Sequence, residues 1–359
     1  MRILAIPRER SNPYQELLYE EMRRLGARIA YLGCHTPSHT LNLLLLPPEL
    51  ACRRLLGWRV VHLHWVYDFT LPGSARFAAM RRLSQAWFVA VLWWMRLLQL
   101  RLVWTAHNVL PHDQVFANDV AARRRLVAAS DLVITHSGAA LAELTALGAK
   151  PRHSEVIAHG PFIPSSPVAS LRVPGTDGDA RQILFVGKVQ AYKGVENLLR
   201  AFLAMPTGVD AELKIAGECP DPQIRSALEG LASRSGSNVS LGLDRVPERA
   251  ITSLLAAADV VALPFERITT SGSAMLALCH GRPLIVPAAP ALAHLPDDAV
   301  IRYDGSTPGL TAALAWAASA KPDELATMSA AALAYAWRYS WADVAKTTIT
   351  AMAAIRHAR

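Results

Sequence analysis

Three kinds of signal are missing from this 359-residue chain, and each absence excludes a class of protein. The only cysteines, Cys34, Cys52, Cys219 and Cys279, are widely spaced and form no Cys-x-x-Cys pair, so neither a disulfide framework nor a zinc site is expected. No Gly-x-Gly-x-x-Gly follows the first apolar run at Ile6, which disfavours nicotinamide-dependent oxidoreduction. No zinc finger, RNA-recognition signature or lysine-rich arm occurs, so nucleic acid is not the expected partner.

The first residues and the longest tryptophan-rich run both bear on location. Residues 1–10, MRILAIPRER, begin directly as a strand without the order of a signal peptide, so we expect a cytoplasmic protein. The run at residues 86–95, AWFVAVLWWM, is about half as long as a membrane-spanning helix. Three tryptophans and flanking arginines are typical of a helix in the headgroup layer of an anionic leaflet. We therefore predict peripheral attachment to the inner face of the plasma membrane, with a buried core helix as the alternative.

Positive charge dominates the first half of the chain. The net charge is +8, while 52% hydrophobic and 18% charged residues indicate a globular protein. Basic residues such as Arg53, Arg54, Arg81, Arg82 and the run 123–125 fall on helical segments, which favours an anionic membrane surface over nucleic acid.

Short apolar runs alternate with helical patterns throughout, which indicates parallel sheets covered by helices on both faces. Residues 161–178 are rich in Pro, Ser and Gly and are typical of a linker. The sequence thus predicts an α/β protein of two doubly wound domains with a cleft between them. The expected strands cover residues 2–6, 28–32, 60–63, 102–105, 132–135, 154–157, 183–186, 212–216, 239–243, 260–263, 283–286 and 299–303.

A phosphate site is predicted where two segments of the second half meet. In the segment 263–287, hydroxyl residues stand at a helix start, where backbone N–H groups and the helix dipole attract anions. Upstream, Gly187 ends a strand and two lysines flank the turn that follows, where open α/β sheets bind ligands. An ordinary helix cap and solvated lysines are the alternatives. The predicted diphosphate clamp comprises Lys188, Lys193, Thr270, Ser271, Gly272 and Ser273.

Five motifs in order give the chain a family resemblance. They are NPY at 12–14, HLHW at 62–65, TAHNVLPHD at 105–113, GKVQAYKG at 187–194 and the TSG turn at 270–272. Together they resemble the xanthan-type β-mannosyltransferases of glycosyltransferase family 94, and more loosely family 4, over nearly the whole chain. The resemblance implies a GT-B fold with Rossmann-like domains. It divides the chain into an acceptor domain (1–160), a linker (161–180), a nucleotide-sugar domain (181–334) and a helical segment at 335–359 that packs back on the first domain. The alternative for the last segment is a plain amphipathic helix capped by Ser340.

The resemblance also assigns ligands to the two domains. It implies that the donor diphosphate lies at the predicted clamp and the acceptor on the first domain. We expect Glu266 and Val246 to lie near the donor sugar or base. On the acceptor side we expect Asn12, Tyr14, His64 and His112.

One departure from family 4 bears on the mechanism. Retaining family 4 enzymes carry two glutamates where this chain has Ile268 and Leu276, which favours an inverting single displacement. That reaction needs a general base. The candidates are Asp68, then Asp113, with His107 expected at the donor sugar or leaving phosphate.

The expected function is transfer of a hexose to a polyprenyl-diphosphate-linked oligosaccharide in exopolysaccharide assembly. The expected hexose is mannose, with GDP-mannose as the donor. No metal or other cofactor is expected, because the Asp-x-Asp at 177–179 falls in the linker. Two alternatives remain: a retaining family 4 transfer from a UDP- or GDP-sugar, and a non-catalytic protein that binds a sugar nucleotide or an anionic lipid.

Overall fold

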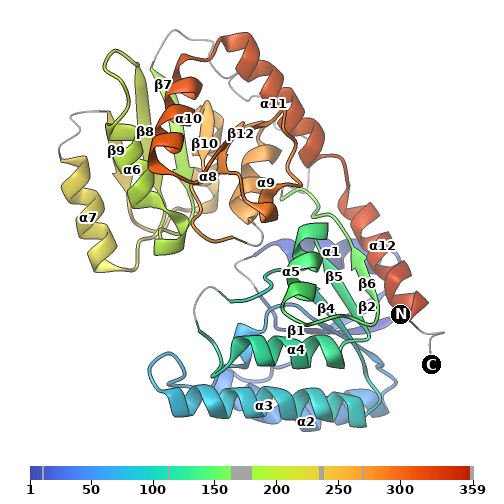
Figure 1. The fold of residues 1–359 in the computed structure, drawn as a ribbon. Coiled ribbons are helices and arrows are strands. Elements are labelled where there is room, and N and C mark those ends of the chain that lie inside the picture. The colour runs from blue at the N-terminus through green and yellow to red at the C-terminus, as the bar shows by residue number, and fades with distance from the viewer. Residues whose placement is uncertain (10–11, 112–113, 163–179, 234–237, 269–270, 356–359) are drawn as a thin grey trace. The chain divides into compact units, whose positions relative to one another are not determined.

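The chain forms two compact units in a computed structural model that describes residues 1–9, 12–111, 114–162, 180–233, 238–268 and 271–355. One unit comprises Met1–Gly160 together with Tyr339–Arg359, and the other comprises Pro161–Arg338. Figure 1 shows the elements of each unit. The first unit contains the predicted acceptor residues and the second unit contains the predicted donor residues.

The first unit is built on a six-stranded parallel sheet of order β2-β1-β3-β4-β5-β6. From β1 the chain first adds β2 on one side and then β3 on the other, so the β1/β3 boundary is a topological switch point. The strands are β1 (Arg2–Ile6), β2 (Arg28–Tyr31), β3 (Val60–Leu63), β4 (Arg101–Ala106), β5 (Leu132–Thr135) and β6 (Ser154–Val156).

Side chains of the first sheet alternate between two hydrophobic cores, as the twofold period of a strand requires. Along β1, Leu4 and Ile6 enter one core, whereas Ile3 and Ala5 enter the other. The first core is covered by α2, α3 and α4, of which α2 and α3 lie side by side in Figure 1. The helices of this unit are α1 (Tyr14–Arg24), α2 (His39–Leu55), α3 (Ala78–Leu97), α4 (Asp119–Ala129), α5 (Gly138–Ala146) and α12 (Trp341–Ala354), with a 3-10 turn η1 (Tyr67–Phe69).

The carboxyl-terminal helix belongs to the first unit. Trp341, Val344 and Met352 of α12 enter the second core, and α12 packs along α1. Ser340 caps this helix, since its hydroxyl accepts a hydrogen bond from Asp343 N at 3.1 Å. The predicted boundary at residue 335 is early, because the helix before it continues to Ala336 and the second unit extends to Arg338.

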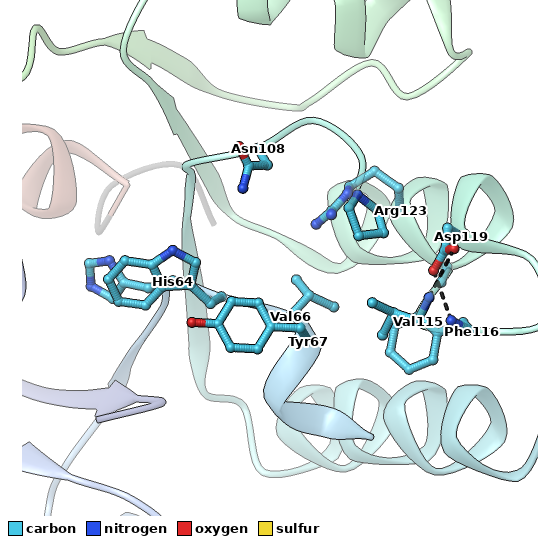
Figure 2. Close-up of a pocket in the computed structure, with 11 residues that line it drawn as sticks. His64, Val66, Tyr67, Asn108, Val115, Phe116, Asp119 and Arg123 are labelled. Carbon is cyan, nitrogen blue, oxygen red and sulfur yellow. Dashed lines mark hydrogen bonds between the residues drawn. The ribbon is translucent and has the colours of Figure 1, made fainter. Parts of the chain in front are cut away.

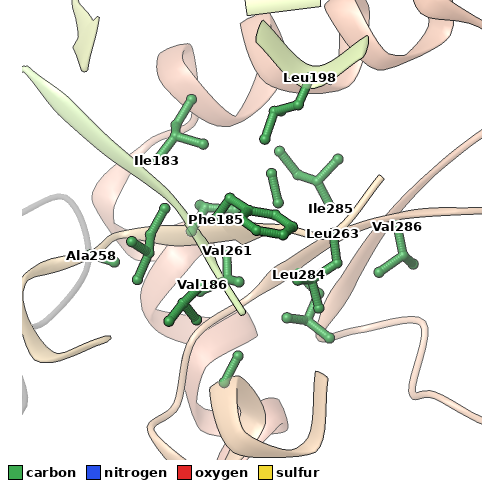
Figure 3. Close-up of a cluster of buried hydrophobic side chains, with 14 of the residues drawn as sticks. Ile183, Phe185, Val186, Leu198, Ala258, Val261, Leu263, Leu284, Ile285 and Val286 are labelled. Atoms are coloured by element: carbon green, nitrogen blue, oxygen red, sulfur yellow. The ribbon is translucent and has the colours of Figure 1, made fainter. Parts of the chain in front are cut away.

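The second unit repeats the architecture with a six-stranded parallel sheet of order β12-β11-β10-β7-β8-β9. Its switch point lies between β7 and β10, and Figure 3 shows the buried side chains gathered there, including Phe185, Val261 and Ile285. The strands are β7 (Arg181–Val186), β8 (Ala211–Ala216), β9 (Val239–Gly242), β10 (Val260–Ala262), β11 (Leu284–Pro287) and β12 (Val300–Tyr303). The helices are α6 (Val195–Leu203), α7 (Pro222–Ala232), α8 (Glu248–Ala257), α9 (Gly272–Cys279), α10 (Thr307–Ser319) and α11 (Pro322–Ala336), with 3-10 turns η2 (Ala191–Lys193) and η3 (Pro290–Leu292).

Each strand expected from the sequence is present, with ends that differ by at most two residues. The doubly wound α/β fold class is therefore confirmed for both units. The tryptophan-rich run at 86–95 lies in α3 and is partly a core helix, as in the alternative considered above. Phe88, Val91, Leu92 and Met95 are buried in the core, and of the three tryptophans only Trp93 is exposed.

Candidate active site

Two loops meet at the switch point of the second sheet. The loop after β7 ends at Gly194, whose φ of +67° suits glycine, and a Cβ there would lie 2.1 Å from the carbonyl oxygen of Pro264 in the loop after β10. Glu266 N also donates to Tyr192 O at 2.9 Å. The two segments of the predicted phosphate site are therefore in direct backbone contact.

The start of α9 lies against the end of β7. A Cβ on Gly187 would be 3.0 Å from Ser273 Oγ, so only a residue without a side chain leaves this approach open. Ser271 caps the helix, since its Oγ accepts from Ala274 N at 3.0 Å. The first N–H groups of a helix have no partner within it, so the amides of Gly272 and Ser273 are available to an anion. Thr270 lies outside the described residues.

The two lysines of the predicted clamp differ in their surroundings. Lys188 is exposed at the start of the loop after β7. Lys193 Nζ lies 4.6 Å from the ring centroid of Phe265 and 5.2 Å from that of Tyr192, which are cation–π contacts. Burial lowers the pKa of Lys193 to about 8, so the ammonium is partly desolvated beside the loop after β10.

The residues predicted near the donor sugar or base lie in the same unit. Glu266 is exposed in the loop after β10, whereas Val246 is partly buried and packs against the core. Ile268 and Leu276, which replace the family 4 glutamates, also pack against this core.

Histidines form a buried hydrogen-bonded chain at the carboxyl ends of β3, β4 and β5. The rings of His62, His64 and His107 are at most 8% exposed, and their burial lowers the pKa of each imidazole, that of His62 to about 3. The links are Thr105 Oγ1 to His62 Nε2 at 2.8 Å, His62 Nδ1 to Tyr19 OH at 2.9 Å, Tyr19 OH to His64 Nε2 at 2.7 Å, His64 Nδ1 to His107 Nε2 at 3.0 Å, His107 Nδ1 to His136 Nε2 at 3.3 Å and His136 Nδ1 to Ile157 O at 3.0 Å.

The Ile157 carbonyl at the end of this histidine chain determines which ring nitrogen donates in each hydrogen bond. Because the Ile157 carbonyl can only accept, Nδ1 of His136 carries a proton, and neutral rings then donate from Nδ1 and accept at Nε2 along the whole chain. The pattern ends with Thr105 donating to His62. His107, expected at the donor sugar or leaving phosphate, is therefore held as a neutral ring. Trp65 stacks on it at 4.4 Å between centroids.

Three predictions for the acceptor side are not supported by the positions of the residues. Tyr14 is 1% exposed and surrounded by the rings of four histidines and Trp341, so it is a core residue and not an acceptor contact. Both ring nitrogens of His64 are occupied within the histidine chain. Asn12 accepts from Tyr14 N at 3.0 Å at the start of α1, a local structural role. His112 and Asp113 lie outside the described residues.

Asp68, the first candidate for the general base, lies beside the switch point of the first sheet. It lines a cavity of about 220 Å³ between η1, the ends of β1 and β2, and α2. Burial raises the pKa of its carboxyl group, with His39 opposing this shift and Glu9 adding to it. A carboxylate with a raised pKa beside an open cavity is chemically able to accept a proton.

Comparisons with known proteins match this geometry. Residues 180–327, most of the second unit, match the family described as Glycosyl transferases group 1. A GDP-mannose:glycolipid 4-beta-D-mannosyltransferase of Xanthomonas campestris pv. campestris is 26% identical over 257 residues, 70% of this chain and 68% of that protein. A D-inositol 3-phosphate glycosyltransferase of Mycolicibacterium vanbaalenii is 30% identical over 61% of this chain and 52% of that protein.

Solved structures agree on the fold. Sucrose-phosphate synthase from Thermosynechococcus elongatus superposes over the whole of both chains with a TM-score of 0.75 at 17% identity. Anabaena Alr3699/HepE in complex with UDP and glucose superposes over 99% of this chain and all of that one, with a TM-score of 0.70 at 15% identity. Residues 180–327 thus match the group 1 glycosyltransferases, and the whole chain has the GT-B fold. The resemblance to this family is thereby confirmed, and the non-catalytic alternative is set aside.

Reasoning from the sequence missed several residues of this glycosyltransferase. Tyr19 and His136 complete the histidine chain, but they come from α1 and the end of β5, and no motif links them. The alternation of His62 and His64 along β3 was the available signal, since it puts both rings on one face. Arg123 was grouped with surface arginines, whereas it is buried in α4.

Two further observations concern metals and membranes. Among the residues that the structure describes, no group of three His, Cys, Asp or Glu side chains is arranged to hold a metal ion. A search of those same residues finds no helix with the length and apolar character needed to cross a bilayer.

Proposed function

We propose that this glycosyltransferase moves mannose from GDP-mannose to a lipid-linked oligosaccharide in exopolysaccharide assembly, with inversion at the anomeric carbon. The observation that carries the proposal is the similarity, over 70% of the chain, to a relative whose name states GDP-mannose, a glycolipid and a β-mannosyl product.

The donor diphosphate is proposed to bind at the switch point of the second sheet. Its negative charge increases when the glycosidic bond to phosphate breaks, so positive groups fixed there stabilise the transition state. Lys188, Lys193 and the amides at the start of α9 supply such groups without a metal.

The apolar residues near this turn support inversion. Ile268 and Leu276 pack against the core where retaining family 4 enzymes carry glutamates. In an inverting transfer, the base accepts the proton of the acceptor hydroxyl, the oxygen bonds to the anomeric carbon, and the bond to phosphate breaks with release of GDP. We propose Asp68 as this base, ahead of Asp113, because its burial raises the pKa of the carboxyl group.

Donor binding is tested first with Lys193→Ala. Calorimetric titration with GDP-mannose is expected to show at least about tenfold weaker binding, because a desolvated charged contact to phosphate is lost. Lys214→Ala removes an exposed lysine of β8 and serves as the control. Equal affinities for the two variants, or no binding of any GDP- or UDP-sugar by the unmodified protein, contradict the donor site.

A retaining transfer is the second candidate, since the D-inositol 3-phosphate glycosyltransferase relative shares 30% identity. The configuration of the new glycosidic bond, read by NMR from the one-bond C1–H1 coupling, separates the two. A β-mannosyl product supports inversion, and an α product supports the alternative.

An apolar, acid-free face of the first unit supports attachment to an anionic membrane. An exposed stripe runs along α2 and includes Leu41, Leu44, Leu45, Leu55 and Leu56. The one acidic residue of α2, Glu49, is buried. The exposed side of neighbouring α3 carries Leu83, Trp93 and Leu97 beside arginines, and residues 69–112 contain no Asp or Glu. Trp94 Nε1 donates to Pro47 O at 2.9 Å, which joins the two helices. We call these exposed residues the α2–α3 face.

Vesicle sedimentation tests this face. Phosphatidylcholine vesicles with and without phosphatidylglycerol are compared, and the anionic vesicles are expected to bind more protein. Leu44→Ser with Trp93→Ser is expected to reduce that binding about tenfold or more, whereas Trp316→Ser, an exposed tryptophan of the second unit, leaves it unchanged. Equal binding by both variants contradicts the proposal.

A further inference from the structure

Arg123 of α4 is a buried arginine that forms no ion pair with any acidic residue that the structure describes. It is 6% exposed, and its guanidinium carbon lies 4.6 Å from the ring centroid of Trp104. Its Nε has no hydrogen-bond partner, and within the described part of the chain no hydrogen bond or ion pair joins the guanidinium to another residue. Burying a charge with only a ring contact to compensate it is costly, so such a group indicates a binding partner that the described residues do not provide.

The carboxylate of Asp119, which interacts electrostatically with Arg123, is already engaged in hydrogen bonds. Asp119, one turn earlier on α4, accepts hydrogen bonds from Phe116 N at 2.9 Å and Val115 N at 3.2 Å. Figure 2 shows these bonds and the Arg123 guanidinium extending away from Asp119, toward the side of the pocket where Asn108 lies. Burial lowers the pKa of Arg123 to about 10, so the side chain is still a cation at neutral pH.

The guanidinium faces a small pocket between the loops after β3 and β4. Its cavity of about 40 Å³ has room for a group the size of a carboxylate or phosphate. Asn108 lines the same pocket, half-buried, and its side chain makes no hydrogen bond to a described residue. Trp65, Val66, Val115 and Phe116 add apolar walls to this pocket.

We infer that Arg123 and Asn108 bind a carboxylate or phosphate group of the acceptor. The planar fork of arginine matches two oxygens of either group, and the amide N–H₂ of asparagine adds a third donor. The acceptor is thus an anionic molecule, its charge borne by an acidic sugar or by the phosphate that joins the oligosaccharide to its lipid. This inference rests on the proposed function for the existence of an acceptor, but the anion site itself is testable alone.

The test compares three variants of the full chain. Glucuronate and methyl phosphate are titrated calorimetrically at constant ionic strength, with glucose as the neutral probe. At least one anion is expected to bind the unmodified protein and Arg125→Met, an exposed neighbour, while Arg123→Met weakens binding at least tenfold. Arg123→Lys is expected to fall between them because lysine keeps the charge and loses the fork. Preference for glucuronate identifies an acidic sugar, and preference for methyl phosphate identifies the lipid phosphate.

Thermal unfolding distinguishes binding from a structural role. Arg123→Met is expected to melt at or above the temperature of Arg125→Met, because an unpaired buried charge is removed. A lower melting temperature, equal anion affinities for the two variants, or no anion binding overturns the inference. Titration with GDP-mannose separates this inference from the proposed function. If Arg123→Met loses GDP-mannose binding, the anion belongs to the donor and the inference of an acceptor site is overturned. If the unmodified protein binds an anion at Arg123 but no sugar nucleotide, the proposed function fails and the anion site stands.

Discussion

The two sheets of this glycosyltransferase have similar doubly wound topologies. They differ at the carboxyl ends of their strands, where backbone contacts dominate in the second unit and buried polar side chains dominate in the first. In the second unit, glycines allow close approach, since Gly194 meets the backbone of Pro264 and Gly187 meets the Ser273 side chain at the start of α9. In the first unit, the edge is filled by side chains, namely the neutral histidine chain and Arg123, which has no acidic partner among the described residues. A site made of backbone amides depends on the path of the backbone, whereas a site made of side chains depends on the hydrogen-bond partners of each side chain. Substitutions in the two units can test this difference.

The largest effect is expected from Gly194→Ala. The new Cβ would lie 2.1 Å from Pro264 O in a backbone conformation with positive φ, so the two loops must separate. Strain and overpacking together are expected to lower the free energy of unfolding by roughly 2–5 kcal/mol and to abolish GDP-mannose binding. Gly208→Ala, also at positive φ but with open space around it, is the control and is expected to cost only about 1 kcal/mol. Urea unfolding measures both, and similar losses would contradict the contact.

Acid should destabilise the first unit selectively. The pKa of His62 is about 3 in the fold against 6.5 when unfolded, so the unfolded chain binds the proton first. Stability is therefore full above pH 6.5 and falls as pH decreases toward 3, by about 1.4 kcal/mol per pH unit for His62 alone. Hydrogen exchange at pH 7 and pH 5, corrected for intrinsic rates, is expected to show lost protection in β3 and β4 before β7 and β10. Equal loss in both sheets contradicts this assignment.

Tyr19→Phe interrupts the histidine chain at one atom. The hydroxyl links His62 Nδ1 to His64 Nε2, and without it two buried ring nitrogens lose a partner. The free energy of unfolding is expected to fall by about 1–3 kcal/mol. Tyr303→Phe is the control, because its hydroxyl makes no hydrogen bond to a described residue of the second unit. The affinity for GDP-mannose should not change in either variant. A loss of affinity specific to Tyr19→Phe would link the histidine chain to donor binding.

The smallest effect separates two similar helix caps. Ser271→Ala and Ser340→Ala each remove a hydroxyl that accepts from the first turn of a helix, α9 in one unit and α12 in the other. Each is expected to cost about 1 kcal/mol in thermal or urea unfolding. Only Ser271→Ala is expected to weaken GDP-mannose binding as well. Weaker binding in both variants indicates a general loss of stability instead of a site at α9.

The predictions from sequence were accurate for contacts between nearby backbone segments. Each expected strand is present because burial on both faces of a parallel sheet requires continuous apolar runs. The close approach of the turns after β7 and β10 was also predictable, since glycine at a strand end favours a positive φ and leaves space for a neighbouring backbone, whereas phosphate binding there stays a prediction. Tyr14 and Arg123 were wrongly placed because burial of a polar side chain depends on what other elements bring to it.

The sequence by itself thus determined the fold class and the two turns where we propose that the donor binds, because periodicity and backbone geometry are local properties. Only the tertiary structure decided which polar side chains are neutral, paired or unpaired. His62, His64 and His107 are buried in one hydrogen-bonded chain that includes Tyr19, and the carboxylate of Asp119 accepts from the loop before it. Their charge states follow from desolvation and from partners distant in the sequence.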